Sequence, residues 1–183
     1  MLNKWALTDS LMSNTGNLIN LPGFRRMELG DVILLTLSGS KMEALRLFII
    51  LYLLRNHLGV SYEYPPWYSS DVWNALRKLI NNGLVDRYSG DRGITMVAIT
   101  ERGVSRINGL VKELGDSMVI IGSALIIKVS DLRLRIKEIT HTYVNMPLRA
   151  LASVALSDAA HELYYLGDRS IASKMLWEAS SIL

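Results

Sequence analysis

The sequence predicts a mainly α-helical protein that carries one small β-hairpin. Three observations lead to this fold class. Apolar residues recur at intervals of three and four along most of the chain, which is the period of a helix. The segment SGDRG, residues 89–93, separates two short apolar runs and is typical of a hairpin turn. Half of the 183 residues are hydrophobic, so the chain can bury a full core.

The composition argues against catalysis. Cys is absent, which excludes disulfide frameworks, Cys-based zinc sites and thiol chemistry. The histidines His57, His141 and His161 are scattered and form no His-x-x-x-His pair. The motif GDRG is a hairpin tip and does not have the pattern of a phosphate-binding loop. We therefore expect no enzyme, no metal and no cofactor.

Charge and hydropathy limit the partners. The formal net charge is +3 and the pI is about 9.2, which suits a polyanionic partner without identifying one. The apolar regions 32–54 and 118–129 are interrupted by charges or too short to span a bilayer. The N-terminus lacks the apolar run and cleavage site of a signal peptide. We expect a cytoplasmic protein without membrane contact.

The first part of the chain predicts an arm and two helices. Residues 1–26 indicate an N-terminal arm, with a short helix over 3–12 and then a loop that closes at two arginines. Residues 28–37 are apolar on most sides, as in a buried helix. Ser40 is a candidate cap for a second helix over 41–57, whose apolar residues recur at helical spacing: Leu45, Phe48, Ile49, Tyr52 and Leu53.

A third helix, a hairpin and a fourth helix follow. Ser69 or Ser70 caps a helix that continues to residue 82 and stops at Gly83; its inward stripe is Val72, Leu76, Leu79 and Ile80. Two antiparallel strands, 84–88 and 94–99, flank the turn, and Thr100 caps the next helix. This order of three helices, a hairpin and a helix predicts a winged helix-turn-helix.

The remaining chain predicts a helical dimerisation or bundle region. Apolar residues continue at helical spacing from Ile107 to Tyr143 and form a seam that can pack against a partner helix. Gly115 is the expected break, and the sequence leaves open whether residues 104–143 form one helix or two. The last two helices, from Pro147 onward, favour an ordinary pair that closes a bundle over a single tetratricopeptide-type hairpin. The predicted domains are the arm 1–26, a DNA-binding domain 27–115 and a helical region 116–183.

The outward face of the third helix suits a major groove. Asparagine can bond adenine, arginine can bond guanine, and serine at a helix start suits phosphate. The residues are Ser69, Ser70, Trp73, Asn74, Arg77 and Lys78. In the hairpin, Arg87 on a strand and Arg92 at the turn can reach phosphate or a minor groove, although Asp86 and Asp91 offset their charges. The alternative is a solvated face, with Trp73 half-buried against the preceding loop.

Two segments carry a family resemblance. SSDVWNALRKLINNGLVDRY, followed by GITMVAITERG, resembles the helix, wing and closing helix of PadR- and MarR-type winged-helix regulators. The PadR pattern of an aromatic-x-Ala-Leu helix, Gly-Leu-hydrophobic and hydrophobic-Thr-Glu-basic-Gly stands here at residues 73–76, 83–85 and 99–103, with Trp73 where the family usually has Tyr. The resemblance covers about residues 28–115. It implies dimeric, sequence-specific DNA binding and transcriptional repression.

The sequence therefore predicts a homodimeric regulator that binds double-stranded DNA. The seam from Ile107 to Tyr143 offers more apolar surface than one small domain covers, so the helices after Pro147 or a second chain must cover it. We expect both together, in a dimer that forms a mixed bundle. The alternative is a winged-helix architectural or adaptor protein whose C-terminal helices bind a protein partner. RNA binding by the same surface also stays open, and the sequence names neither operator nor effector.

Overall fold

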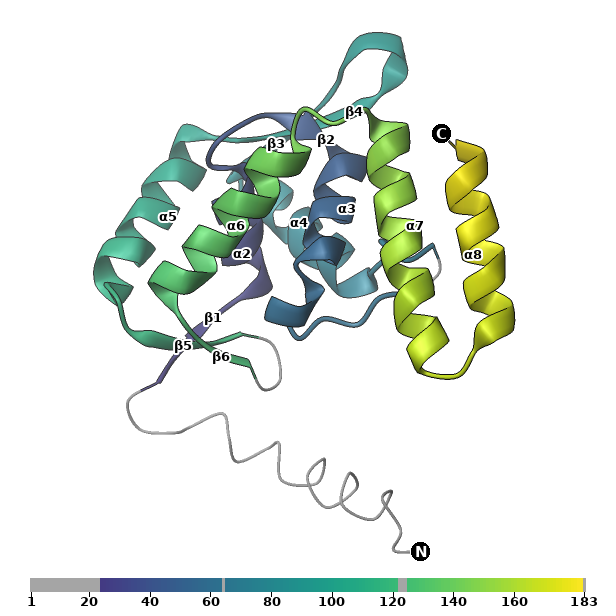
Figure 1. Ribbon diagram of the computed structural model, residues 1–183. Helices are drawn as coiled ribbons and strands as arrows, with labels where there is room; N and C mark the ends of the chain where they lie inside the picture. Colours follow the sequence, from purple (N-terminus) through teal and green to yellow (C-terminus); the bar gives the residue numbers. More distant parts are fainter. Residues whose placement is uncertain (1–23, 64, 122–124, 183) are drawn as a thin grey trace, which may run out of the picture.

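The computed structural model describes residues 24–63, 65–121 and 125–182 (Figure 1). These residues form seven α-helices and two three-stranded sheets, which confirms a mainly helical fold with a small β component. The helix predicted over 3–12 lies outside the described residues. No helix in the described ranges is long and apolar enough to cross a membrane.

The first half of the chain alternates helices with one small sheet. From residue 29 onward its elements are α2 (Leu29–Leu37), β2 (Met42–Glu43), α3 (Ala44–Leu53), η2 (Arg55–His57), α4 (Ser70–Asn81), β3 (Val85–Ser89), η3 (Asp91–Gly93) and β4 (Thr95–Ile99). The sheet has the order β2-β4-β3, and all its pairs are antiparallel. The β3–β4 hairpin projects beyond the helices at the top of Figure 1. The three predicted helices and the hairpin are confirmed.

The start and the apolar stripe of α3 differ from the prediction. Ser40 is not its cap, because residues 42 and 43 form β2 and pair with Val97 and Met96 of β4. Leu45 is exposed, whereas Leu47, Ile50 and Leu51 are buried together with Phe48, Ile49 and Tyr52. A helix that is buried on most sides has no single stripe, so periodicity could not identify its inward face.

Short-range capping contacts fix the ends of α4 and the start of α5 (Glu101–Leu114). The Ser69 hydroxyl accepts a hydrogen bond from the Val72 N–H, and Gly83 ends α4 with a φ of +65°. Thr100 caps α5 by accepting from the Gly103 N–H at 3.1 Å, and its hydroxyl donates to the Gly83 carbonyl at 2.8 Å. These contacts confirm the predicted caps and stop.

The predicted helical seam is interrupted by a second sheet. Strands β1 (Arg25–Met27), β5 (Met118–Ile121) and β6 (Leu125–Lys128) have the order β1-β5-β6, with β1 parallel to β5. The expected helix over 118–128 and the expected loop at residues 25 and 26 are therefore wrong. Gly115, with a φ of +56°, ends α5 as expected, and the apolar run after it is rich in β-branched residues that pair with β1. Helix α6 (Val129–Tyr143) follows.

The seam is covered within the chain itself. Its residues Ile107, Leu114, Ile121, Leu132 and Ile136 are buried in one core cluster with α2, α3 and α4. The expectation that the helices after Pro147 cover these residues is wrong, because they belong to the cluster of α2, α3 and α4 and not to that of α7 and α8. The dimer stays a prediction. The predicted domain boundary between residues 115 and 116 stays a prediction.

A second core cluster joins the C-terminal helices to α3. Helices α7 (Leu148–Tyr165) and α8 (Arg169–Ile182) form a hairpin through small buried residues, among them Ala155, Ala159, Ala172 and Ala179. Ile49 and Tyr52 of α3 also belong to this cluster. Helix α3 thus lies between the two clusters, with α7 and α8 to its right in Figure 1. The predicted closing pair of helices is confirmed.

Candidate nucleic-acid interface

Helix α4 has one buried and one exposed face. Val72, Leu76 and Leu79 are buried against the core. The residues predicted to face DNA are exposed at five of six positions: Ser70, Trp73, Asn74, Arg77 and Lys78. Ser69 is only 1% exposed, and its hydroxyl is engaged by the Val72 N–H. Ser69 therefore caps the helix from inside and cannot reach a ligand at the surface.

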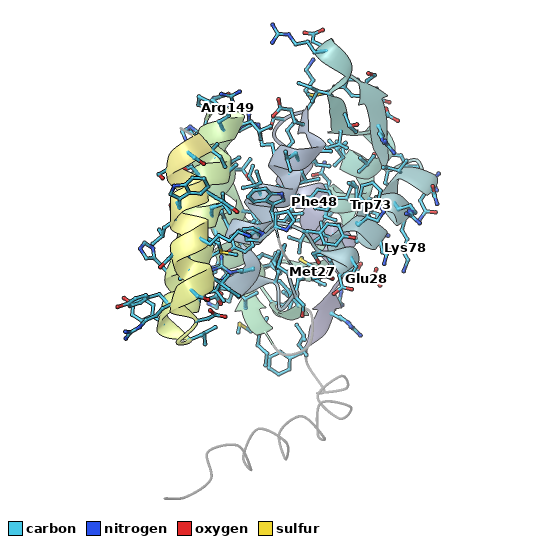
Figure 2. All side chains as sticks on the ribbon, turned by 90° about the vertical axis from the view of Figure 1, so that its right-hand side faces the viewer. Met27, Glu28, Phe48, Trp73, Lys78 and Arg149 are labelled. Carbon is cyan, nitrogen blue, oxygen red and sulfur yellow. The ribbon has the colours of Figure 1, made fainter. Side chains whose placement is uncertain are left out.

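Trp73 is a half-buried support of the exposed face. Its side chain is 38% exposed, and its ring centroid lies 6.0 Å from that of Phe48 in α3 (Figure 2). The Arg77 guanidinium carbon lies 5.7 Å from the Trp73 ring centroid, within the range of a cation–π contact. Trp73 thus packs on α3 and holds Arg77 on the exposed face. Trp73 and Arg77, both predicted from the sequence, are therefore in contact with each other on this face.

Asn74 and Lys78 line a polar hollow of about 720 Å³ between α4 and the start of α2. Its opposite wall carries Asp31, which is buried, and Arg106 of α5, which pairs with Asp31 at 3.0 Å. The Asp31 carboxylate also accepts from the Glu28 N–H at 3.2 Å, so its charge is compensated twice. Glu28 and the exposed Asp71 of α4 also line the hollow, so its three cations, Arg26, Lys78 and Arg106, lie among three acids.

Arg106 is a cation that the sequence does not place at this surface. Nothing in the sequence connects it with α4, because it lies in a different helix and its partner Asp31 is 75 positions away. Its guanidinium side chain is about half exposed at the edge of the hollow. Only the packing of α5 on α2 brings this cation beside Asn74 and Lys78.

The hairpin presents the two predicted arginines to solvent. Arg87 of β3 lies opposite Val97 of β4, and its side chain is exposed. Arg92 lies in the tip with a φ of 56°, the left-handed conformation that is uncommon for a residue with a side chain. Asp86 and Asp91 are exposed beside them, as expected. The arrangement can contact phosphate through two separate guanidinium groups.

Helix α4 and the hairpin lie on one side of the molecule. Figure 2 shows Lys78 and the projecting hairpin on the side opposite α8. Eight residues were predicted from the sequence for this surface, and seven of them reach solvent. Among the described residues, no group of three or more His, Asp or Glu side chains is placed to hold a metal ion.

Comparisons with known proteins give little further information. No protein-family model matches the chain, and no curated protein matches it. One solved structure, that of smu.1604c from Streptococcus mutans UA159, is similar over 85% of this chain and 94% of that chain. The identity is 17% and the TM-score is 0.40. A likeness of this size establishes neither fold nor function.

Proposed function

We propose that this chain is a winged helix-turn-helix protein that binds double-stranded DNA and represses transcription as a homodimer. One observation carries the proposal. A capped helix, α4, presents hydrogen-bonding and cationic side chains on a surface that continues into a hairpin with two exposed arginines. The order of α2, β2, α3, α4, β3 and β4, with β2 paired to β4, supports the fold assignment.

In this proposal α4 enters the major groove, which is about 12 Å wide and admits a helix. Asn74 and Arg77 are the candidates for base edges, because both side chains are exposed and each can form two hydrogen bonds with one base: the Asn amide donates one and accepts one, and the Arg guanidinium donates two. Ser70 and the free N–H groups of the first turn suit phosphate. Lys78, at the side of the exposed face of α4, suits a contact with phosphate. The hairpin then places Arg92 on the adjacent backbone or minor groove.

The proposed dimer uses α8, because the chain already buries the seam from Ile107 to Tyr143. Trp177 is 71% exposed and lies on the face of α8 opposite the buried Ala172 and Ala179. Leu176 beside it is also exposed. An exposed tryptophan with an apolar neighbour is typical of an association surface.

The test is DNA binding by the full chain and three alanine variants, measured at several salt concentrations against a selected operator and random duplexes. Arg77→Ala and Asn74→Ala should each weaken operator binding by about 1–3 kcal/mol and reduce the preference for the operator. Arg92→Ala should weaken binding to all duplexes alike. It should also lower the slope of the logarithm of affinity against the logarithm of salt concentration by about one. Arg149→Ala is the matched control, since it removes an exposed arginine on the α7–α8 side (Figure 2).

Several outcomes would contradict the proposal. If Arg77→Ala and Asn74→Ala bind the operator as tightly as the parent, α4 is not the reading helix. If the parent binds duplexes without any preference, the architectural alternative replaces the regulator, and the exposed face of α8 becomes its assembly surface. If the chain binds RNA more tightly than DNA of the same sequence, RNA replaces DNA as the proposed ligand.

A further inference from the structure

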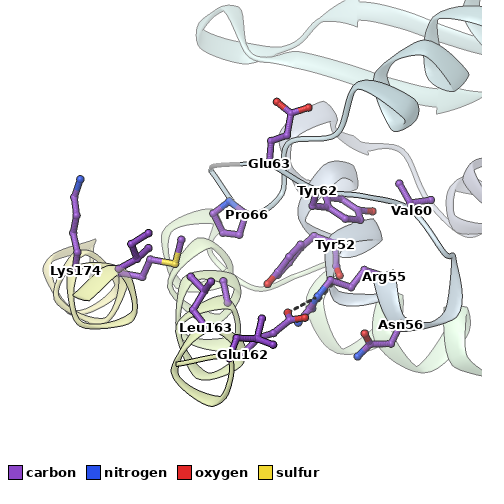
Figure 3. A pocket seen from close by; sticks show the side chains of 14 residues that line it. Tyr52, Arg55, Asn56, Val60, Tyr62, Glu63, Pro66, Glu162, Leu163 and Lys174 are labelled. Carbon is purple, nitrogen blue, oxygen red and sulfur yellow. Dashed lines mark hydrogen bonds and ion pairs between the residues drawn. The ribbon is translucent and has the colours of Figure 1, made fainter. Parts of the chain in front are cut away.

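Two cavities of similar size lie away from α4 in the described part of the chain, and they differ in charge. The first has a volume of about 670 Å³ and lies between the C-terminal end of α3, the segment 60–66 and the α7–α8 hairpin (Figure 3). Its cations pair with carboxylates of the chain: Arg55 contacts Asp158 at 2.6 Å and Glu162 at 2.7 Å, and Lys174 lies 4.0 Å from Glu178. Glu63 adds another carboxylate to the lining. These lining residues therefore leave no cation unpaired.

The second cavity lies between the C-terminal end of α2 and one face of α6, and its volume is about 630 Å³. That volume is within the range of sites for small molecules. Its apolar wall is aliphatic and consists of Leu35, Leu134, Ile136 and Val144. Leu134 is 55% exposed, which leaves apolar surface for a ligand to cover. Among the described residues that line it there is no Phe, Tyr or Trp, so the wall suits an aliphatic chain.

The polar side of this second cavity carries a row of three basic side chains. Arg133, Lys137 and His141 of α6 line it at intervals of four positions. Residues at this interval share one face of a helix and follow each other by about 6 Å along its axis. All three side chains are exposed. With the other described residues none of them forms an ion pair or a side-chain hydrogen bond, and no Asp or Glu is among the lining residues.

The acids near this row lie outside the cavity. Glu138 of α6 pairs with Arg135 at 3.5 Å, and Asp131 at the start of the helix is not part of the lining. Asp116 is hydrogen-bonded by Ser130, the lining residue closest to the start of α6. Like charges four positions apart on a helix repel each other and destabilise it. The described residues leave this repulsion uncompensated, and an anion in the cavity would relieve it.

We propose that the second cavity binds an aliphatic phosphate monoester, with its phosphate on the row and its chain on Leu35 and Leu134. Lys137 lies in the middle of the row, so a phosphate beside it also reaches Arg133 or His141. A phosphate has three free oxygens and nearly two negative charges, which suits a row of donors better than one carboxylate does. A nucleic acid fits less well, because the wall offers no aromatic side chain on which a base could stack. The site does not rest on the DNA-binding proposal.

Five alkyl probes test this chemistry on the full chain. Octyl phosphate carries the proposed head and chain. Octanoate changes the head, octylammonium reverses its charge and 1-octanol removes the charge. Methyl phosphate keeps the head and removes most of the chain. Each probe is titrated below the concentration at which it aggregates, and ligand-observed proton NMR measures its affinity.

The informative variant is the double substitution Arg133→Gln and Lys137→Gln. Glutamine is a good helix former, and both positions are exposed, so the variant should fold like the parent. The double substitution Arg135→Gln and Lys112→Gln is the matched control, because it removes the same charge from two exposed positions outside the lining. Thermal melting checks that both variants are folded.

Octyl phosphate should bind most tightly of the five probes, and about tenfold or more tightly than methyl phosphate because its chain leaves water. The double variant should bind octyl phosphate about tenfold more weakly and 1-octanol unchanged, whereas the control should bind every probe like the parent. The proposal is overturned if octyl phosphate does not bind or if another probe binds as tightly. It is also overturned if the Arg133→Gln and Lys137→Gln variant binds octyl phosphate unchanged.

The same head group also occurs on lipids at a membrane surface. Vesicles of phosphatidylcholine with and without phosphatidate separate this source from a soluble ester. The proposal requires that the chain stay in solution with both kinds of vesicle. Cosedimentation with the phosphatidate vesicles would overturn it and assign the row on α6 to a membrane surface.

Discussion

Replacing Gly103 with alanine should destabilise the chain, although alanine is the better helix former. A Cβ at this position would lie 2.2 Å from the Leu84 carbonyl oxygen and 2.7 Å from a side-chain carbon of Ile99. Ordinary van der Waals contacts begin at 3.4 Å, so α5 and the base of the hairpin must separate by about 1.2 Å. The clash therefore falls on the junction that sets the hairpin against the helices.

The backbone of Leu84 cannot move freely to accommodate the new atom. Its carbonyl accepts from the Thr100 N–H at 3.1 Å, and its own N–H donates to Leu79 at 2.9 Å. Overpacking costs about 1–3 kcal/mol, and a backbone obstacle places this site at the upper end. Alanine recovers about 1 kcal/mol through its helix propensity. The expected net loss in the free energy of unfolding is about 1–2 kcal/mol.

Urea titration followed by circular dichroism measures this loss, and α5 supplies its own control. Gly109 lies two turns further along, where no atom comes within 4 Å of an added Cβ, so Gly109→Ala should gain about 0.5–1 kcal/mol. Both substitutions remove the backbone freedom of one glycine from the same helix. They differ only in the room that is available for the new Cβ. Equal stabilities of the two variants would refute the close approach of α5 to Leu84.

Two further predictions concern stability against pH and association. Burial raises the pKa of Tyr52 and Tyr62, while unfolded tyrosines ionise near pH 10; the stability these groups contribute is therefore complete below about pH 10 and lost as the pH rises further. In urea titrations at several pH values, the Tyr52→Phe and Tyr62→Phe double variant should lose less stability above pH 10 than the parent. An equal loss in variant and parent would contradict the prediction. In sedimentation velocity, we expect the parent to be the proposed dimer, Trp177→Ser to shift it toward monomer, and Tyr88→Ser on the hairpin to leave it unchanged. A monomeric parent would contradict the α8 interface.

Much of the helical part was predictable because its signals act over a few residues. Ser69 and Thr100 cap helices through their own third neighbours, and Gly83 and Gly115 adopt the positive φ values that end a helix. The exposed face of α4 followed from the same 3.6-residue period, so Arg77 and Asn74 could be placed before the structure was known. Ser69 was misplaced because capping and phosphate contact require the same residue type.

Only the tertiary structure decided which distant segments meet. The run 118–121 has a spacing that suits a helix as well as a strand, and it became a strand because β1, more than 90 positions earlier, pairs with it. Arg46 interrupts an apolar run in the sequence, yet it donates to the carbonyls of Tyr143 and Met146 where α6 ends. The cavity between α3 and α7 likewise has no local signature. Pairing and burial across such separations depend on surfaces that exist only after folding, whereas caps and turns depend on neighbours that the chain always carries with it.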